Sequence, residues 1–187
     1  MIDGPKPVVI RARPVYAAPM ATELHALTVP PLRRGLTQLA AILEKGRAFA
    51  EEQGFPPETL LEARLAEDMA TLIRQVQLAS DSAKFAGARL AGITPPPMAD
   101  TETSFAELAD RVAATIAFLD TIPPEAMQGR EETDVTLKTS SRSFEFKALA
   151  YLQRFALPNF YFHVTTAYAI LRHKGVPLAK PDYLGAF

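Results

Sequence analysis

The chain has 187 residues, of which 48% are hydrophobic and 22% charged, a balance typical of a folded domain rather than a disordered chain. The 20 Lys and Arg side chains nearly cancel the 21 Asp and Glu, so the positive excess of nucleic-acid-binding or membrane-surface proteins is missing. The absence of cysteine excludes disulfides, thiolate metal sites and a cysteine nucleophile. We therefore expect one domain in the cytoplasm, with no nucleic-acid or membrane partner.

Residues 1–19 differ from the rest of the chain because they contain four prolines and no sustained apolar period. Proline removes a backbone donor and restricts the residue before it, so no helix is expected here. We interpret this segment as a flexible N-terminal arm, either dispensable or paired with the surface of another subunit. A single domain is expected over residues 20–187.

The first helix is predicted from Glu23 to Gln53, where leucines recur at helical spacing up to a stop at Gly54. Pro30 and Pro31 interrupt this pattern, so we expect a kink or a helix start there, with Thr28 as a candidate N-cap.

A short helical segment is expected over residues 56–64, and a second long helix from about Glu67 to Ala91, closed by Gly92. Residues 93–103 contain three successive prolines and are predicted to form a linker.

The third helix begins with a capping-box signature, since Ser104 and Glu107 have the Ser-x-x-Glu spacing. Between Asp134 and Lys147, apolar and polar residues alternate on both sides of residues 139–142, which predicts a hairpin with one solvated face. A final helix is expected from Ala148 to about Lys174.

Four long helices, each with one apolar stripe, are buried most simply as a four-helix bundle. The proline-rich linker and the hairpin leave room for a crossover connection, so the order of the helices stays open. The predicted fold is all-α, a four-helix bundle with a crossover and a small β-hairpin before the last helix.

The last helix contains an uncharged run, residues 155–171, that approaches the length of a membrane span. Its polar residues and the flanking Arg154 and Arg172 favour a central helix of the bundle instead. On this helix His163 and Asn159 fall on the same face as the apolar side chains. His163 is then either a core histidine with satisfied hydrogen bonds or a group that orients a ligand or acts as a general base.

Partners for His163 are expected on a stripe of the second helix that includes Asp68, Gln75 and Ser82. On the last helix, Tyr161, Thr165 and Tyr168 form a polar and aromatic stripe that we place beside His163. Polar groups around an apolar cavity are typical of small-molecule sites, although they also occur in ordinary bundle interiors. The predicted ligand-binding residues are His163, Asn159, Tyr161, Tyr168, Gln75 and Asp68.

The positions of the three histidines disfavour a metal centre. His163 and His173 are separated by about 15 Å along one helix, which is too far to share an ion. His25 and His163 could meet across the bundle, but the other ligands would have to be Asp, Glu or water. We expect no cofactor.

Several segments resemble one bacterial family of unknown function, DUF1993, over Leu24 to Gly185. The segments are TVPPLRRGL, EARLAEDMATLIRQVQLASDSAK, TSFAELADRVAATIAFLD, PNFYFHVTTAYAILRHKGVPL and KPDYLG. The resemblance implies a DinB/YfiT-like helical bundle that is frequently dimeric, in a superfamily often described as metalloenzymes.

Metal-binding members of that superfamily use three histidines, one on the second helix and a His-x-x-x-His pair on the last. Here His163 matches one of the pair, but Ala167 lies four residues later and the second helix contains no histidine. Three functions stay open: metal-independent small-molecule binding near His163, metal-assisted chemistry similar to that of DinB-like thiol transferases, and a structural role as a homodimer.

Overall fold

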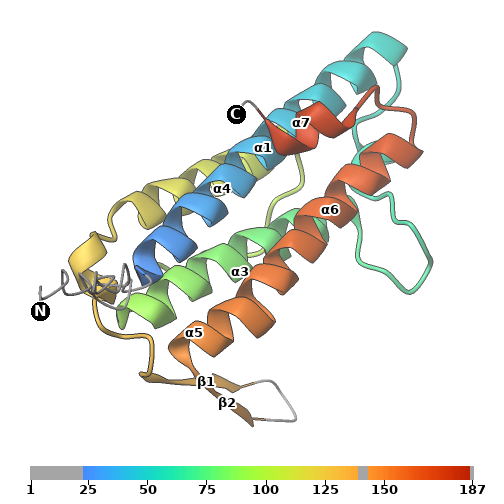
Figure 1. The fold of residues 1–187 in the computed structure, drawn as a ribbon. Coiled ribbons are helices and arrows are strands. Elements are labelled where there is room, and N and C mark those ends of the chain that lie inside the picture. The colour runs from blue at the N-terminus through green and yellow to red at the C-terminus, as the bar shows by residue number, and fades with distance from the viewer. Residues whose placement is uncertain (1–22, 139–142, 186–187) are drawn as a thin grey trace, which may run out of the picture.

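The computed structural model describes residues 23–138 and 143–185, so the predicted arm (1–19) and the hairpin turn (139–142) lie outside the described residues. The long helices form a bundle (Figure 1): α1 (Leu24–Gln53), α3 (Leu72–Ala91), α4 (Phe105–Asp120) and α6 (Leu157–His173). The shorter elements are α2 (Glu58–Leu61), the 3₁₀ turn η1 (Pro124–Met127), β1 (Asp134–Lys138), β2 (Ser143–Lys147), α5 (Ala148–Tyr151), the π-helical turn η2 (Leu152–Ala156) and α7 (Lys180–Leu184).

The helices are arranged so that α1 and α3 each contact both α4 and α6. Gly35 of α1 lies against Phe160 of α6 and Gly46 lies against Leu171, so these two helices run parallel. Contacts of Asp81 with Arg111, and of Gly87 with Leu119, show that α3 and α4 are also parallel. Parallel neighbours cannot be joined by a short turn, and the predicted crossover is confirmed in the connection between α3 and α4.

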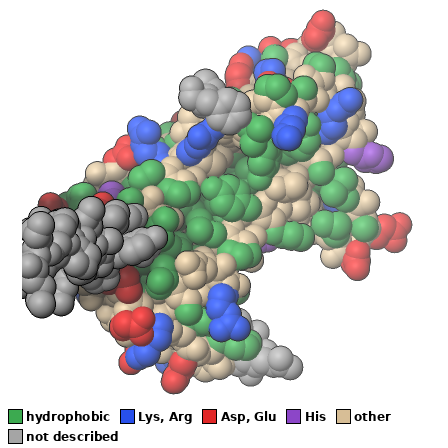
Figure 2. Space-filling view, viewed as in Figure 1, with side chains coloured by type: hydrophobic (Ala, Val, Ile, Leu, Met, Phe, Trp, Pro, Cys, Tyr) green, Lys and Arg blue, Asp and Glu red, His purple; other side chains and the backbone are tan. Residues whose placement is uncertain are grey.

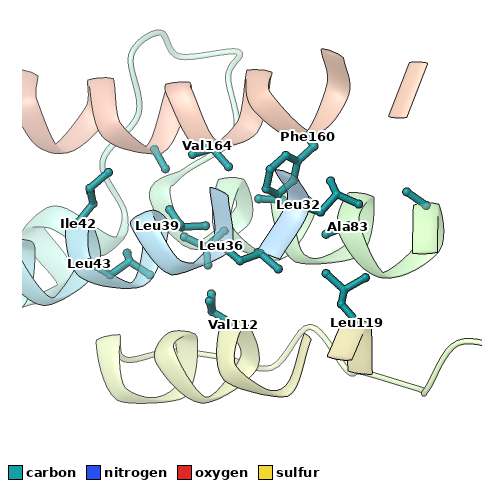
Figure 3. Close-up of a cluster of buried hydrophobic side chains, with 14 of the residues drawn as sticks. Leu32, Leu36, Leu39, Ile42, Leu43, Ala83, Val112, Leu119, Phe160 and Val164 are labelled. Atoms are coloured by element: carbon teal, nitrogen blue, oxygen red, sulfur yellow. The ribbon is translucent and has the colours of Figure 1, made fainter. Parts of the chain in front are cut away.

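The hydrophobic core lies between the long helices (Figure 3). Leu36 and Leu39 of α1 are fully buried, with Phe160 of α6 on one side and Val112 and Leu119 of α4 on the other. Each such side chain contributes about 1.5–3 kcal/mol to folding when it is removed from water. The predicted four-helix bundle is confirmed.

The first helix begins at Leu24 and continues through Pro30 and Pro31, so a helix start at the prolines is wrong. Thr28 is not an N-cap; its buried hydroxyl donates to the Leu24 carbonyl at 2.6 Å. Packing at the start of α1 explains why the helix begins before the prolines, because Leu24, Thr28 and Val29 are all buried. Tertiary burial therefore outweighs the hydrogen bonds that the two prolines cannot make.

The second long helix begins at Leu72, five residues later than predicted from Glu67. Its N-cap is Thr71, whose hydroxyl oxygen accepts a hydrogen bond from the Arg74 backbone. Asp68 lies in the preceding turn and is exposed. The expectation that Asp68 lies on the stripe of the second helix that faces His163 is therefore wrong, because the helix begins only after this residue.

The last helix runs without a break from Ala148 to His173, close to the predicted range. Its π-helical turn, Leu152–Ala156, precedes Pro158. Proline lacks an amide hydrogen and its ring presses against the carbonyl four residues earlier, so a widened turn accommodates it. Among the described residues, no helix combines the length and apolar character needed to cross a membrane.

The hairpin pairs β1 and β2 in antiparallel register, with Val135 opposite Phe146 and Leu137 opposite Phe144. Val135 and Leu137 are buried while the intervening residues of β1 are exposed, as the alternating pattern predicts. Phe146, which lies opposite Val135, also packs against Tyr151 of α5, with the ring centroids 6.1 Å apart.

The connection between α3 and α4, residues 92–104, must return along the bundle because the two helices are parallel. The 16 residues of α4 correspond to a length of about 24 Å. The returning linker is held by Arg111, a residue of α4 whose side chain is only 2% exposed. Its guanidinium donates to the carbonyl of Ala99 and to the carboxylate of Glu102, both at 2.9 Å.

The same guanidinium also binds α3, through Asp81 at 3.0 Å and Ser80 at 3.1 Å. Asp100 of the linker completes the set at 3.0 Å. Burial disfavours the charged guanidinium, but the hydrogen bond to Glu102 and the charges of Glu102, Asp81 and Asp100 outweigh it and raise the pKa of Arg111. We call Arg111 with its partners Ser80, Asp81, Ala99, Asp100 and Glu102 the Arg111 cluster.

Replacing Arg111 by methionine should lower the free energy of unfolding by about 3–5 kcal/mol, since it leaves the mostly buried carboxylate of Glu102 without its counterion. Urea unfolding followed by circular dichroism measures the loss. Arg33→Met is the control, because Arg33 forms an exposed pair with Asp120, and such pairs contribute about 1 kcal/mol or less. Equal, small losses for both variants would contradict a central role for the Arg111 cluster.

Candidate functional site

His163 lies on α6 with its ring against α3 and is 9% exposed. Its Nδ1 is 2.8 Å from Oε1 of Gln75, a buried residue of α3. The Gln75 amide nitrogen donates to the carbonyl of Ala70 at 3.2 Å, which leaves Oε1 as the acceptor facing the ring. Nδ1 of His163 is therefore the protonated nitrogen, and Nε2 carries the lone pair.

The Nε2 atom of His163 is not fully enclosed, although the residue as a whole is buried. In the described part of the chain, no buried side-chain nitrogen or oxygen lacks a hydrogen-bond partner, and the only hydrogen bond of this ring is made by Nδ1. Burial lowers the pKa of His163 and the positive charge of Arg74 lowers it further. The imidazole is therefore neutral near pH 7, with Nε2 as its basic nitrogen.

Asn159 lies one turn before His163 and also faces α3. Its Nδ2 donates to the hydroxyl of Ser82 at 2.7 Å, and that hydroxyl donates to the Leu78 carbonyl at 2.6 Å. The predicted inward face of the last helix is confirmed at both positions. We call Gln75, Ser82, Asn159 and His163 the polar seam; Ser82 lies on the predicted stripe but is not among the predicted ligand-binding residues.

Tyr161 and Tyr168 lie away from the polar seam. Tyr161, 37% exposed, lines a groove between α1 and α6, and its hydroxyl is 3.5 Å from the carbonyl of Pro31. Tyr168 packs edge-on against Tyr183 of α7, with the ring centroids 5.8 Å apart. Helix geometry explains the separation of Tyr161, because it lies two residues from both Asn159 and His163. Two residues correspond to about 200° of rotation around the helix axis. The structure brings His163, Asn159 and Gln75 together and separates Tyr161, Tyr168 and Asp68 from them.

The side chains available as metal ligands at the polar seam do not fit the three-histidine metal site that the resemblance implies. The second and last long helices present one imidazole and two carboxamides there, and the carboxamides of Gln75 and Asn159 are engaged with neighbouring groups. His25 lies elsewhere, with its Nε2 3.0 Å from the carbonyl of Ile122. Over residues 23–138 and 143–185, no group of three or more His, Asp or Glu side chains could hold a metal ion.

The polar seam can accept hydrogen bonds at its surface. Nε2 of His163 is an acceptor or a proton-accepting base, and the ring packs edge-on against Phe162, whose side chain is 55% exposed. The contacts of the described residues give His163 neither a carboxylate partner nor a neighbouring nucleophile.

Comparison with known proteins places the fold. A family model described as a domain of unknown function, DUF1993, matches residues 24–184. The crystal structure of a DinB family member protein from Shewanella denitrificans is similar to this chain, with a TM-score of 0.81 and 40% sequence identity over 88% of this chain and 93% of that chain. No curated protein matches the present chain. The chain therefore belongs to the DUF1993 family, and its fold is the DinB-like helical bundle.

Proposed function

We propose that this protein binds a small molecule at the polar seam, through Nε2 of His163 and without a bound metal. The observation that carries this proposal is the hydrogen bond between Nδ1 of His163 and Oε1 of Gln75. A buried amide on α3 orients the ring and fixes its tautomer, so that Nε2 is the nitrogen left to accept a hydrogen bond. Fixing an acceptor in this way lowers the entropic cost of binding a ligand.

The chemistry of the seam indicates which ligands it favours. An unprotonated Nε2 accepts a hydrogen bond, so the ligand should carry an N–H or O–H donor. The exposed ring of Phe162 beside His163 offers an apolar surface for the rest of the molecule. We therefore expect a small molecule in which a donor group adjoins an apolar or aromatic part.

The other two functions have less support. Metal-assisted chemistry would need ligands that the carboxamides of Gln75 and Asn159 do not supply. The homodimer stays a prediction.

A library of small aromatic and aliphatic compounds with N–H or O–H donors, screened by thermal shift with a chelator present, should contain compounds that raise the Tm of the wild-type protein. When the ligand concentration is about 100 times the Kd, such binding stabilises the native state by about 2.7 kcal/mol. The shift should disappear in His163→Ala and persist in His173→Ala, which removes an exposed histidine from the same helix. A shift that survives in His163→Ala would refute the assignment, as would a library without a single binder.

The lowered pKa of His163 predicts a pH-dependent stability. The unfolded chain takes up a proton at this residue near pH 6.5, whereas the folded chain does so only at lower pH. The stability contributed by the neutral ring is therefore present above about pH 6.5 and is lost as the pH falls through the folded pKa.

Two measurements check this pH dependence. A titration followed by NMR should show His163 titrating at lower pH than free histidine, and urea unfolding should show a smaller loss on acidification for His163→Gln than for wild type. Gln75→Glu should raise the pKa of His163, because a carboxylate favours the charged ring. If the stability of wild type and His163→Gln fell in parallel with acidification, the linkage to this residue would be wrong.

A further inference from the structure

The polar seam combines the backbone arrangement of a metal site with the side chains of a hydrogen-bonded contact. Asn159 and His163 are four positions apart on α6. Asn159 meets Ser82 of α3, and His163 meets Gln75 of the same helix. Two imidazoles at this spacing on one helix can bind the same zinc ion, and a facing helix can supply a third. Positions 75, 159 and 163 are therefore distributed over the two helices as a three-histidine site requires.

The structure also shows which neighbour of His163 lies in the seam. The helices α3 and α6 run in opposite directions, because Asn159 lies beside Ser82 and His163 lies beside Gln75. Position 167 is therefore farther toward the start of α3. Ala167 there is fully buried in the hydrophobic core, as is Leu72, the first residue of α3. The polar pair on α6 consists of positions 159 and 163, and position 167 belongs to the apolar core.

Oxygen atoms that could orient ligating imidazoles are already present around the seam. A metal-binding histidine uses one ring nitrogen for the ion and donates from the other to a nearby oxygen. The Ser82 hydroxyl accepts from Asn159 at 2.7 Å, and the Ala70 carbonyl accepts from Gln75 at 3.2 Å. The surroundings that would orient two further imidazoles therefore orient two carboxamides in this chain.

The side chains that are present close the seam without a metal. The amide nitrogens of Gln75 and Asn159 donate hydrogen bonds and have no lone pair to offer a cation. Oε1 of Gln75 accepts the Nδ1 proton of His163 at 2.8 Å, so this oxygen and this nitrogen are paired with each other. The positive charge of Arg74, which helps to lower the pKa of His163, also opposes a divalent cation there.

We propose that the polar seam stands in place of a metal site: hydrogen bonds of Gln75 and Asn159 join α3 to α6 where two imidazoles and an ion would do so. Histidine at positions 75 and 159 would then provide a site for zinc, a cation that imidazole suits well. This role of the seam does not depend on the small molecule proposed above, because it is tested with the metal alone.

The other two histidines of the chain lie outside the seam. Nε2 of His25 is 3.0 Å from the Ile122 carbonyl, and His173 is in the last turn of α6. On the face that Figure 2 displays, the histidine side chains lie well apart from one another. A titration with zinc can therefore distinguish the seam from the remaining imidazoles by the response of His163.

Zinc sulfate added to the wild-type protein gives the first test. Isothermal titration calorimetry should show no tight stoichiometric binding, and the Tm should be the same in zinc and in EDTA. The NMR resonances of the His163 ring should not shift at one equivalent of zinc. One equivalent of bound zinc that shifts these resonances, and is lost in His163→Ala, would overturn the proposal.

The double variant Gln75→His/Asn159→His gives the second test. Its Kd for zinc should be about a hundredfold lower than that of the wild type, because three imidazoles then share one ion. Zinc should raise its Tm, and cobalt(II) should give the visible spectrum of a tetrahedral ion. Adding His163→Ala should abolish these effects.

A simple histidine pair on α6 is the matched control. Ala169→His places an imidazole four positions before His173, in the last turns of the same helix, where no residue of the seam faces it. This variant should bind zinc at least about tenfold more weakly than Gln75→His/Asn159→His, which has a third ligand on α3. Equal affinity of the two variants would contradict the proposed contribution of position 75.

The single variant Asn159→His guards against a double variant that does not fold. Position 159 is only half-buried, and the substitution completes the pair with His163. It should lower the Kd for zinc about tenfold relative to wild type and shift the His163 resonances. Circular dichroism confirms that each variant is folded. A folded Asn159→His or double variant that binds zinc no more tightly than wild type would overturn the proposal.

Discussion

The parallel packing of α3 beside α4 is the constraint on which the arrangement of the bundle depends. It forces the connecting chain to return along both helices, and the buried Arg111 guanidinium holds that returning segment in place. A hydrophobic residue in its position could fill the space, but it would not distinguish one path of the linker from another. We infer that the charges of the Arg111 cluster select the path, while the apolar core supplies the larger part of the stability.

The last long helix presents different groups on its two sides. Toward α3 it presents His163 and Asn159 to the polar partners Gln75 and Ser82. Toward α1 it presents Tyr161, whose hydroxyl lies 3.5 Å from the carbonyl of Pro31. The two sides of α6 therefore differ in the groups with which they pair. A single helix can do this because neighbouring positions along it point in different directions.

Much of the fold could be predicted because local signals agreed with tertiary packing. The capping box of Ser104 with Glu107 marks the start of α4, and the alternation from Asp134 to Lys147 marks the hairpin. Pro30 and Pro31 were misleading because their cost is local, whereas the burial of Leu24 and Val29 that offsets it depends on other helices. The parallel helix pairs could not be predicted, since periodicity identifies helices without giving their directions.

The candidate site was predictable only in part, for related reasons. His163 and Asn159 share a face at helical spacing, and Gln75 is a polar residue on a mainly apolar helix, so the pattern permits their meeting without showing it. The separation of Tyr161 from His163 could have been found from the 200° rotation alone. The groove that Tyr161 lines could not, because it requires α7 to fold back against α1.

The π-helical turn at Leu152–Ala156 has a consequence for the angular phase of the last helix. Tyr151 and His163 are twelve positions apart, which in an uninterrupted α-helix would place them about 120° apart around the axis. A π-turn winds one additional residue into the helix and so removes about 100° of that offset. Both side chains can then face the interior, where the structure places them. The widened turn lets the aromatic end near the hairpin and the histidine end of this long helix be oriented toward the same core.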